Sequence, residues 1–168
     1  LKGGIEYFDG QFDDARLAIN LAQTSAEQGG VLLNYFPVKR LLKEGGMING
    51  VMATDLETNK EYTIHAKVVI NATGVFVDDI LQMDSKDANP LVRPSQGVHL
   101  VFEKSFLNSN SAMMIPKTSD GRVLFAVPWH EHVLVGTTDT LIDENSLEPR
   151  ALETEIDFIL GTVKQYFS

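Results

Sequence analysis

The stretch Lys67-Val-Val-Ile-Asn-Ala-Thr-Gly74 decides the fold, because it predicts a buried strand that ends at small residues. Its short β-branched run is typical of a strand that is covered on both faces, as in a parallel sheet. Ala72 and Gly74 leave room for a ligand to approach the backbone closely. The alternative interpretation is that Thr73-Gly74 is only a turn between a strand and a helix.

The residues before this stretch predict an α/β unit. Two short extended runs, Gly3 to Phe8 and Val31 to Phe36, flank a segment in which leucines and alanines recur at helical spacing. An aspartate at position 13 or 14 can cap this helix, and Gly29-Gly30 ends it near Gln28. A strand, a helix and a strand in this order favour parallel pairing, so we expect Val31 to Phe36 and Lys67 to Ala72 to share one sheet.

A β-meander is predicted between these two runs. Turn residues at Glu44-Gly45-Gly46 and at Thr58-Asn59-Lys60 separate three extended segments. The segments are Val38 to Lys43, Met47 to Thr54 and Glu61 to His65.

The residues after Gly74 predict a short helix and then a β-rich second region. Val77, Ile80 and Leu81 have helical spacing, and the first turn of such a helix is a natural place for a phosphate oxygen. The polar segment Asp84 to Pro94 marks the crossing into the second region. That region holds the extended runs Gln96 to Glu103, Ala112 to Ile115, Arg122 to Trp129 and His132 to Thr137, followed by a helix from Glu153 to Phe167. The expected fold class is α+β, with part of an α/β domain and its meander joined to an antiparallel sheet with helices.

Composition narrows the classes of function. The 168 residues, 43% of them hydrophobic, suffice for one core or two small lobes. A net charge of −9 with scattered basic residues argues against nucleic-acid binding. The absence of cysteine excludes disulfides and thiol catalysis, and the four histidines lack a metal-binding spacing. The first residues resemble neither a signal peptide nor a natural start, so we expect a longer parent protein.

A few residues are candidates for chemistry, each with a structural alternative. Gly136-Thr137-Thr138-Asp139 offers two hydroxyls and a carboxylate to a polar ligand, or forms an Asx or Ser/Thr turn. His99 faces a cavity or is a hydrogen-bonded core residue. Arg93 and Arg122 are solvated cations or anion clamps. The chain has no glycine-rich dinucleotide fingerprint, P-loop, nucleophile elbow or metalloprotease helix, so its residues alone form no complete catalytic constellation.

Six ordered blocks of sequence resemble the FAD-dependent glycerol-3-phosphate dehydrogenase family, part of a wider group of flavoproteins built like D-amino-acid oxidase. The similarity covers nearly the whole chain, and the preserved order makes the set far more specific than any one block. The blocks are Gly3 to Leu17, Asn71 to Gly74, Arg93 to Val101, Asp120 to Arg122, Val127 to Trp129 and Gly136 to Asp139. Val75-Phe76 departs from the Pro-Trp that the family commonly has.

The resemblance implies the central fragment of such an enzyme, with residues 1–84 in the FAD-binding domain and residues 85–168 in the substrate-binding cap. In that family the Ala-Thr-Gly turn lies against the flavin, so Ala72, Thr73 and Gly74 are implied as cofactor-binding residues, with Val38 toward the adenine end. No residue is implied as the catalytic base. The implied substrate-side candidates are His99, Arg122, Thr137, Thr138 and Asp139.

The resemblance also implies a reaction and its partners. A hydride passes from carbon 2 of sn-glycerol 3-phosphate to FAD and dihydroxyacetone phosphate forms, with electrons passed to quinone, or to oxygen in oxidase members. Because this chain lacks the fingerprint and a later Gly-x-Arg-Pro segment, we expect the fragment alone to be inactive and not to retain FAD. We also expect most cationic contacts to the phosphate to come from the rest of the enzyme.

The family further implies a cytoplasmic location. Peripheral contact with the inner face of the cytoplasmic membrane and assembly into a homo-oligomer are two open alternatives.

One alternative function is a related FAD-dependent enzyme that oxidises an amine or amino acid, because Arg122 and Gly136 to Asp139 suit a carboxylate as well as a phosphate. A third is a non-catalytic β-rich interaction module, which a dinucleotide fingerprint upstream in the parent would exclude.

Overall fold

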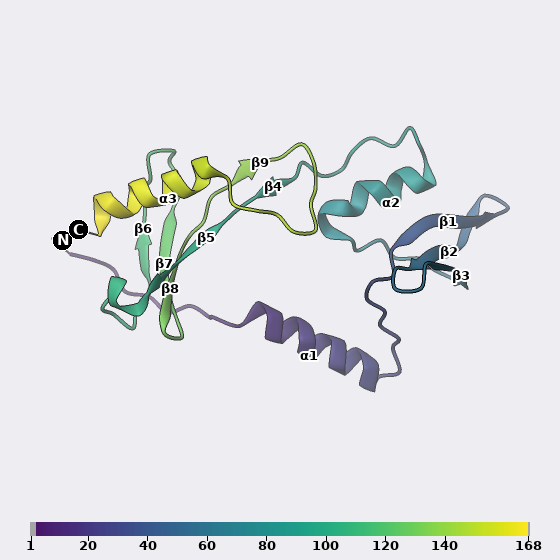
Figure 1. Cartoon of the computed structure of the whole chain (residues 1–168), viewed down its shortest axis with the longest axis horizontal. Helices are drawn as coiled ribbons and strands as arrows, with labels where there is room; N and C mark the ends of the chain where they lie inside the picture. Colours follow the sequence, from purple (N-terminus) through teal and green to yellow (C-terminus); the bar gives the residue numbers. More distant parts are fainter. Residues whose placement is uncertain (1–2, 168) are drawn as a thin grey trace. The chain divides into compact units, whose positions relative to one another are not determined.

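The computed structural model describes residues 3–167 and divides into two compact units, one ending at Ile70 and the other beginning at Asn71. Figure 1 follows the chain through both, from purple to yellow. All strand pairs within the described residues are antiparallel, and helices accompany them in each unit. The predicted α+β class is therefore confirmed. The boundary expected after residue 84 concerns the whole enzyme and stays a prediction.

The first helix of the first unit is the one that the sequence predicts. Helix α1 spans Asp14–Glu27, and the side chain of Asp13 accepts a hydrogen bond from the backbone N–H of Arg16 at 2.9 Å. This contact satisfies one of the free donors at the helix start. Gly29 follows with a φ of +86°, a conformation that ends helices and that glycine adopts without strain.

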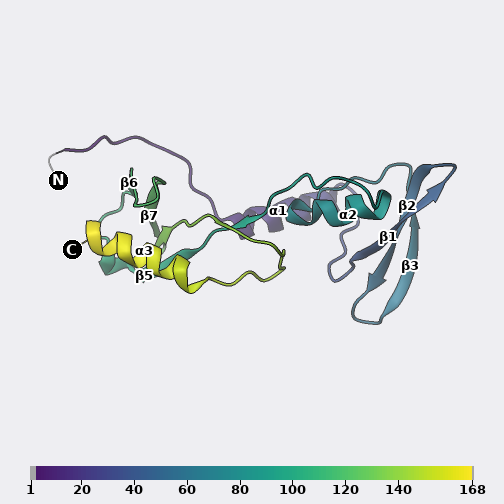
Figure 2. The same ribbon diagram turned by 90° about the horizontal axis from the view of Figure 1, so that it is seen from above.

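The β-meander is also confirmed. Strands β1 (Val38–Glu44), β2 (Met47–Asp55) and β3 (Lys60–His65) form one sheet in the order β1-β2-β3 (Figure 2). The predicted glycine turn joins β1 to β2, and Asn59 with a positive φ lies in the turn before β3. Ala53 at the centre of the sheet is buried opposite Val38 and Tyr62.

The structure differs from the prediction at three apolar runs. Residues 3–8, 31–36 and 67–72 contain no strand. Their side chains are largely exposed, with 95% of Phe8 and 83% of Ile70 open to solvent. A strand is stabilised by a ladder of backbone hydrogen bonds to a neighbour. These runs form no such ladder with a described strand, although Tyr35 accepts one backbone hydrogen bond from Leu56, just after β2. The β-branched pattern therefore indicates a strand preference that finds no pairing partner among residues 3–167.

The second unit contains the predicted short helix and the predicted antiparallel sheet. A 3₁₀ turn, η1 (Gly74–Phe76), leads into α2 (Val77–Asp84), as expected beyond Gly74. The predicted run Gln96 to Glu103 is divided into two strands that pair with different partners. Strand β4 (Ser95–Gln96) pairs with β9 (Thr140–Leu141). A separate four-stranded sheet has the order β5 (His99–Glu103), β8 (His132–Gly136), β7 (Leu124–Trp129) and β6 (Met113–Ile115). The 3₁₀ turn η2 (Lys104–Phe106) follows β5, and the last element is the helix α3 (Glu153–Tyr166).

Helix α3 covers one face of the four-stranded sheet and creates the main core (Figure 1). Leu124 and Ala126 alternate along β7 so that both reach the buried face, as the pleat predicts. Ile159 and Val163, one turn apart on α3, pack on the same cluster. This core fixes the ends of β5 and β8, where several candidate residues lie.

Candidate functional site

The side chain of Asn71 holds the Ala72-Thr73-Gly74 turn. Its Nδ2 donates to the carbonyl oxygen of Val77 at 2.9 Å, and its Oδ1 accepts from the hydroxyl of Thr73 at 2.8 Å. Gly74 has a φ of +59°, in the left-handed region that favours glycine, and nothing lies within 4 Å of the place where a Cβ would be. The turn therefore presents exposed backbone and small side chains, with open space over Gly74.

Two polar contacts tie this turn and α2 to later parts of the same unit. The carboxylate of Asp78 accepts hydrogen bonds from the backbone N–H groups of Leu91 at 2.8 Å and Val92 at 3.1 Å. Nδ2 of Asn145 donates to the carbonyl oxygen of Val75 at 2.6 Å. The chain that follows β9 therefore contacts the residue immediately after the Ala-Thr-Gly turn.

His99 and Thr137 lie where β5 begins and β8 ends, and we call this place the β5–β8 junction. His99 lies opposite Gly136 in the strand register, and a Cβ on Gly136 would approach His99 Cδ2 and the carbonyl oxygen of Val98 to 2.7 Å. A Cβ on Gly97 would lie 2.6 Å from Oγ1 of Thr137. The two glycines therefore let the strands approach closely. His99 and Thr137 are both exposed, so His99 is not a core histidine, and both side chains are accessible to a ligand.

Thr138, in contrast, is buried and uses its hydroxyl inside the protein. Only 3% of the residue is exposed. Its Oγ1 accepts a hydrogen bond from the backbone N–H of Val98 at 3.0 Å and donates to Oε1 of Glu155 at 3.1 Å. Thr138 therefore connects the segment between β4 and β5 to the first turn of α3.

Glu155 is a buried carboxylate with several donors around it. It is 2% exposed, and its Oε2 accepts from Gln96 Nε2 at 2.8 Å and from the backbone N–H of Leu152 at 2.9 Å. Burial raises the pKa of this carboxyl, but hydrogen bonds from Leu152, Thr140, Gln96 and Thr138 together outweigh burial and lower the pKa below its usual value. The group is therefore ionised at neutral pH.

Arg122 is engaged by Asp120 in the turn between β6 and β7. Its Nε donates to Asp120 Oδ2 at 2.7 Å, and its Nη2 contacts the same oxygen. The hydrogen bond from Arg122 is the largest influence that lowers the pKa of Asp120 to about 2, and Asp120 in turn raises the pKa of Arg122. The negative charge of the exposed Asp139 also raises the pKa of Arg122. The guanidinium also lies over the ring of Phe158, at 5.3 Å from its centroid.

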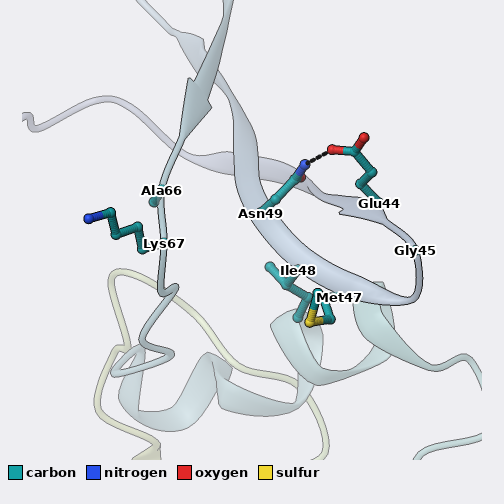
Figure 3. A pocket seen from close by; sticks show the side chains of 7 residues that line it. All are labelled: Glu44, Gly45, Met47, Ile48, Asn49, Ala66 and Lys67. Carbon is teal, nitrogen blue, oxygen red and sulfur yellow. Dashed lines mark hydrogen bonds between the residues drawn. The ribbon is translucent and has the colours of Figure 1, made fainter.

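Val38 belongs to the first unit, whereas the other candidates belong to the second. It begins β1 and is half-buried opposite Ala53. In the same unit, the β1–β2 hairpin and the segment after β3 border an open pocket of about 400 Å³ (Figure 3). Its lining is mainly apolar, and the hydrogen bond from Asn49 to Glu44 lies at its edge. The pocket is lined by Glu44, Gly45, Met47, Ile48, Asn49, Ala66 and Lys67.

Neither a metal-binding cluster nor a membrane-crossing helix occurs within residues 3–167. No group of three or more histidine, aspartate or glutamate side chains in this part of the chain could hold a metal ion. Among the described helices, none is long and apolar enough to cross a membrane.

Sequence reasoning missed the roles of Asn71 and Glu155. Asn71 was recognised only as part of a block, although asparagine commonly bonds to backbone two residues ahead. Glu155 is one of two acids in the first turn of α3, where the helix dipole alone favours a carboxylate. Its position three residues after Leu152 matches the acidic half of a capping box, which is the signal that could have identified it.

Comparison with known proteins places the chain in a family. The sequence profile described as FAD dependent oxidoreductase matches residues 1–168. The chain is 40% identical over 174 residues to the mitochondrial glycerol-3-phosphate dehydrogenase of Homo sapiens, covering 100% of this chain and 24% of that protein. It is also 40% identical over 176 residues to the probable mitochondrial glycerol-3-phosphate dehydrogenase of Dictyostelium discoideum, covering 99% of this chain and 27% of the relative. The chain thus spans about a quarter of the length of these relatives.

A solved structure agrees with the sequence relatives. The glycerol-3-phosphate dehydrogenase from Bacillus halodurans, complexed with FAD, matches with a TM-score of 0.86 and 35% identity, covering 92% of this chain and 31% of that chain. The resemblance inferred from the six blocks is confirmed. The expected cytoplasmic location is wrong, because the curated relatives are mitochondrial proteins. With a profile match over its full length and relatives at 40% identity, the chain belongs to the FAD dependent oxidoreductase family.

Proposed function

We propose that this chain is the central part of an enzyme that oxidises sn-glycerol 3-phosphate to dihydroxyacetone phosphate with FAD and passes electrons to quinone. The observation that carries the proposal is 40% identity to glycerol-3-phosphate dehydrogenases along the whole chain. The sequence identity covers both the Ala-Thr-Gly turn, which we propose to contact the cofactor, and the β5–β8 junction, which we propose to contact the substrate. A homo-oligomer remains a prediction.

The residues of the turn fit an FAD molecule. Ala72, Thr73 and Gly74 are exposed, and apart from its chain neighbours nothing lies within 4 Å of the place where a Cβ of Gly74 would be. Asn71 fixes the turn from the protein side, so the turn can contact a cofactor without first rearranging. Val38 is proposed to approach the adenine end. When bound, FAD would supply the hydride acceptor, and the protein has to bind and orient the substrate beside it.

Substrate orientation is assigned to the exposed side chains of the β5–β8 junction. His99 offers an imidazole to the hydroxyl groups of glycerol 3-phosphate. The hydroxyl of Thr137 donates to the carbonyl oxygen of Thr138 at 3.0 Å, so it offers its oxygen to the substrate as an acceptor. Thr138 is not assigned a direct contact with the substrate, because its hydroxyl already accepts from Val98 and donates to Glu155. These two hydrogen bonds fix the backbone next to His99 and Thr137. Asp139 stays a substrate-side candidate because its carboxylate is exposed.

The phosphate group of the substrate needs cations, and Arg122 is not free to supply one because Asp120 already pairs with it. Asp120 neutralises much of the charge of Arg122, and the chain carries a net charge of −9. A dianion is bound best by arginine or lysine without a competing carboxylate. We therefore propose that residues elsewhere in the enzyme hold the phosphate and that Arg122 chiefly secures the turn before β7.

The whole enzyme is proposed to divide functionally near residue 84, with residues 1–84 in the FAD-binding domain and residues 85–168 in the substrate-binding cap. The exposed apolar runs at 31–36 and 67–72 would then pair with strands of the remaining FAD-binding domain. Such incompleteness predicts that the 168-residue chain alone is inactive. When this chain is mixed with FAD, we expect the flavin fluorescence to equal that of free FAD. Stoichiometric quenching of the flavin fluorescence would contradict the proposed incompleteness.

The function is tested by turnover of the complete parent enzyme on three substrates, sn-glycerol 3-phosphate, glycine and sarcosine, with a soluble quinone as acceptor. We expect turnover of sn-glycerol 3-phosphate alone. Turnover of either amino acid instead would assign the enzyme to the amine-oxidising flavoproteins. Equal rates under oxygen with no quinone added would refute quinone as the electron acceptor.

A further inference from the structure

We propose that Glu155 is a positioning residue for this reaction, because its buried carboxylate fixes, through Thr138, the backbone that presents His99 and Thr137. The inference rests on the proposed function insofar as His99 and Thr137 face the substrate. Glu155 lies in the first turn of α3, outside every sequence block that indicates the family. The evidence for a positioning role of Glu155 is its set of hydrogen bonds to Gln96, Thr138 and Leu152.

The carboxylate of Glu155 is the point where four segments meet. Leu152 contributes a backbone N–H from the chain before α3, and Gln96 contributes an amide from β4. Thr140, which lies opposite Gln96 in the β4–β9 pair, adds its side chain, and Thr138 adds its hydroxyl from the chain between β8 and β9. Strands β4 and β9 are only two residues long, so their own backbone pairing is short, and the carboxylate adds one contact to each strand through Gln96 and Thr140.

The connection from Glu155 to the junction passes through a single hydroxyl. Thr138 Oγ1 donates to Glu155 Oε1, which leaves the oxygen of Thr138 oriented to accept the backbone N–H of Val98. Val98 directly precedes His99, and Thr138 directly follows Thr137. The two exposed residues are therefore each one peptide bond from an atom that this hydrogen-bond chain fixes.

The burial of Glu155 requires that its carboxylate be held by the surrounding donors. A carboxylate that is 2% exposed is costly to bury unless its oxygens are well satisfied. Within residues 3–167 no lysine or arginine pairs with this carboxylate, and neutral donors balance its charge. A glutamine in its place would put an NH₂ group against one of these donors, so the network would have to reorganise.

The test uses the complete parent enzyme and single-turnover kinetics. The variants are Glu155→Gln, Thr138→Val and Thr138→Ser, with Glu153→Gln as the matched control because Glu153 is exposed in the same helical turn. FAD content is measured first. The rate of anaerobic flavin bleaching by sn-glycerol 3-phosphate is then expressed per bound flavin, so that a loss of cofactor or of folded protein is not counted as a loss of rate.

We expect Glu155→Gln and Thr138→Val to slow flavin reduction roughly 10- to 100-fold at saturating substrate, because small misplacement of positioning groups has effects of that order. Thr138→Ser, which keeps the hydroxyl, should restore most of the rate, and Glu153→Gln should match wild type. If Glu155→Gln does not fold, the Thr138 pair decides the question. Wild-type rates per bound flavin in Thr138→Val would overturn the inference, as would an equal loss in Thr138→Ser. A wild-type flavin that stays oxidised would refute the proposed function instead.

Discussion

Replacing Gly136 with alanine tests the close approach of β8 to β5 on which the junction depends. The new Cβ would lie 2.7 Å from the backbone oxygen of Val98 and 2.7 Å from the ring of His99. Gly136 is not among the glycines with positive φ, so the effect arises from crowding and not from backbone conformation. Because the obstacle on one side is backbone, the strands have to separate. Inserting a methyl group into a packed contact costs about 1–3 kcal/mol.

The matched control is Gly161→Ala in α3. A Cβ on Gly161 would meet nothing within 4 Å, and alanine stabilises a helix interior by about 0.5–1 kcal/mol relative to glycine. The same chemical change should therefore act with opposite sign at the two sites. For a chain of this size, Gly136→Ala should lower Tm by about 2–12 °C and Gly161→Ala should raise it by about 1–4 °C.

Thermal unfolding of the purified chain, followed by far-UV circular dichroism, measures both shifts. The parent enzyme carrying Gly136→Ala should also reduce its flavin more slowly with sn-glycerol 3-phosphate, because His99 is displaced. If Gly136→Ala were as stable as wild type, the predicted contact between the two strands would be wrong. A Tm that falls in Gly161→Ala would refute the argument that open space decides the sign.

Three further predictions concern the core, the ion pair and the first helix. Leu124→Ala should lower the free energy of unfolding by about 3–5 kcal/mol in a urea titration, whereas Leu141→Ala at an exposed site should change it by less than about 0.5 kcal/mol; similar losses would contradict the assigned core. An NMR titration should give Asp120 a pKa of about 2, so its carboxylate stays ionised until the pH falls well below the usual pKa of aspartate. Arg122→Gln should raise the pKa of Asp120 toward about 3.9, because the hydrogen bond from Arg122 is lost. An unchanged pKa in this variant would exclude the pairing. Asp13→Ala should destabilise α1 by about 0.5–2 kcal/mol, seen as faster amide exchange in its first turn, and unchanged exchange would show that the cap is unimportant.

Local signals in the sequence predicted the elements whose stability is local. Helix α1 has an aspartate cap and a glycine end, the meander has its turn residues in the right places, and the apolar stripe of α3 identified the helix that covers the sheet. Each of these signals acts within a few residues of the element that it specifies, so no knowledge of the tertiary fold was needed.

The misses have a common physical cause. The runs at 31–36 and 67–72 have strand composition, but a strand also needs a neighbour, and pairing partners are not encoded in the run itself. Glu155 resembles the other acids near the start of α3, and only the orientation of the helix on the sheet decides which acid is buried. Likewise, the exposure of His99 and the burial of Thr138 follow from how β5 and β8 approach each other, which strand periodicity alone did not determine.

The most direct test of the central claim is an anaerobic absorption spectrum of the complete parent enzyme before and after addition of sn-glycerol 3-phosphate. The proposed function predicts a bound flavin whose visible absorption band bleaches on addition of the substrate, because the hydride removed from carbon 2 reduces the ring. A bound flavin that stays oxidised with this substrate, or an enzyme purified under gentle conditions that holds no flavin, would contradict it.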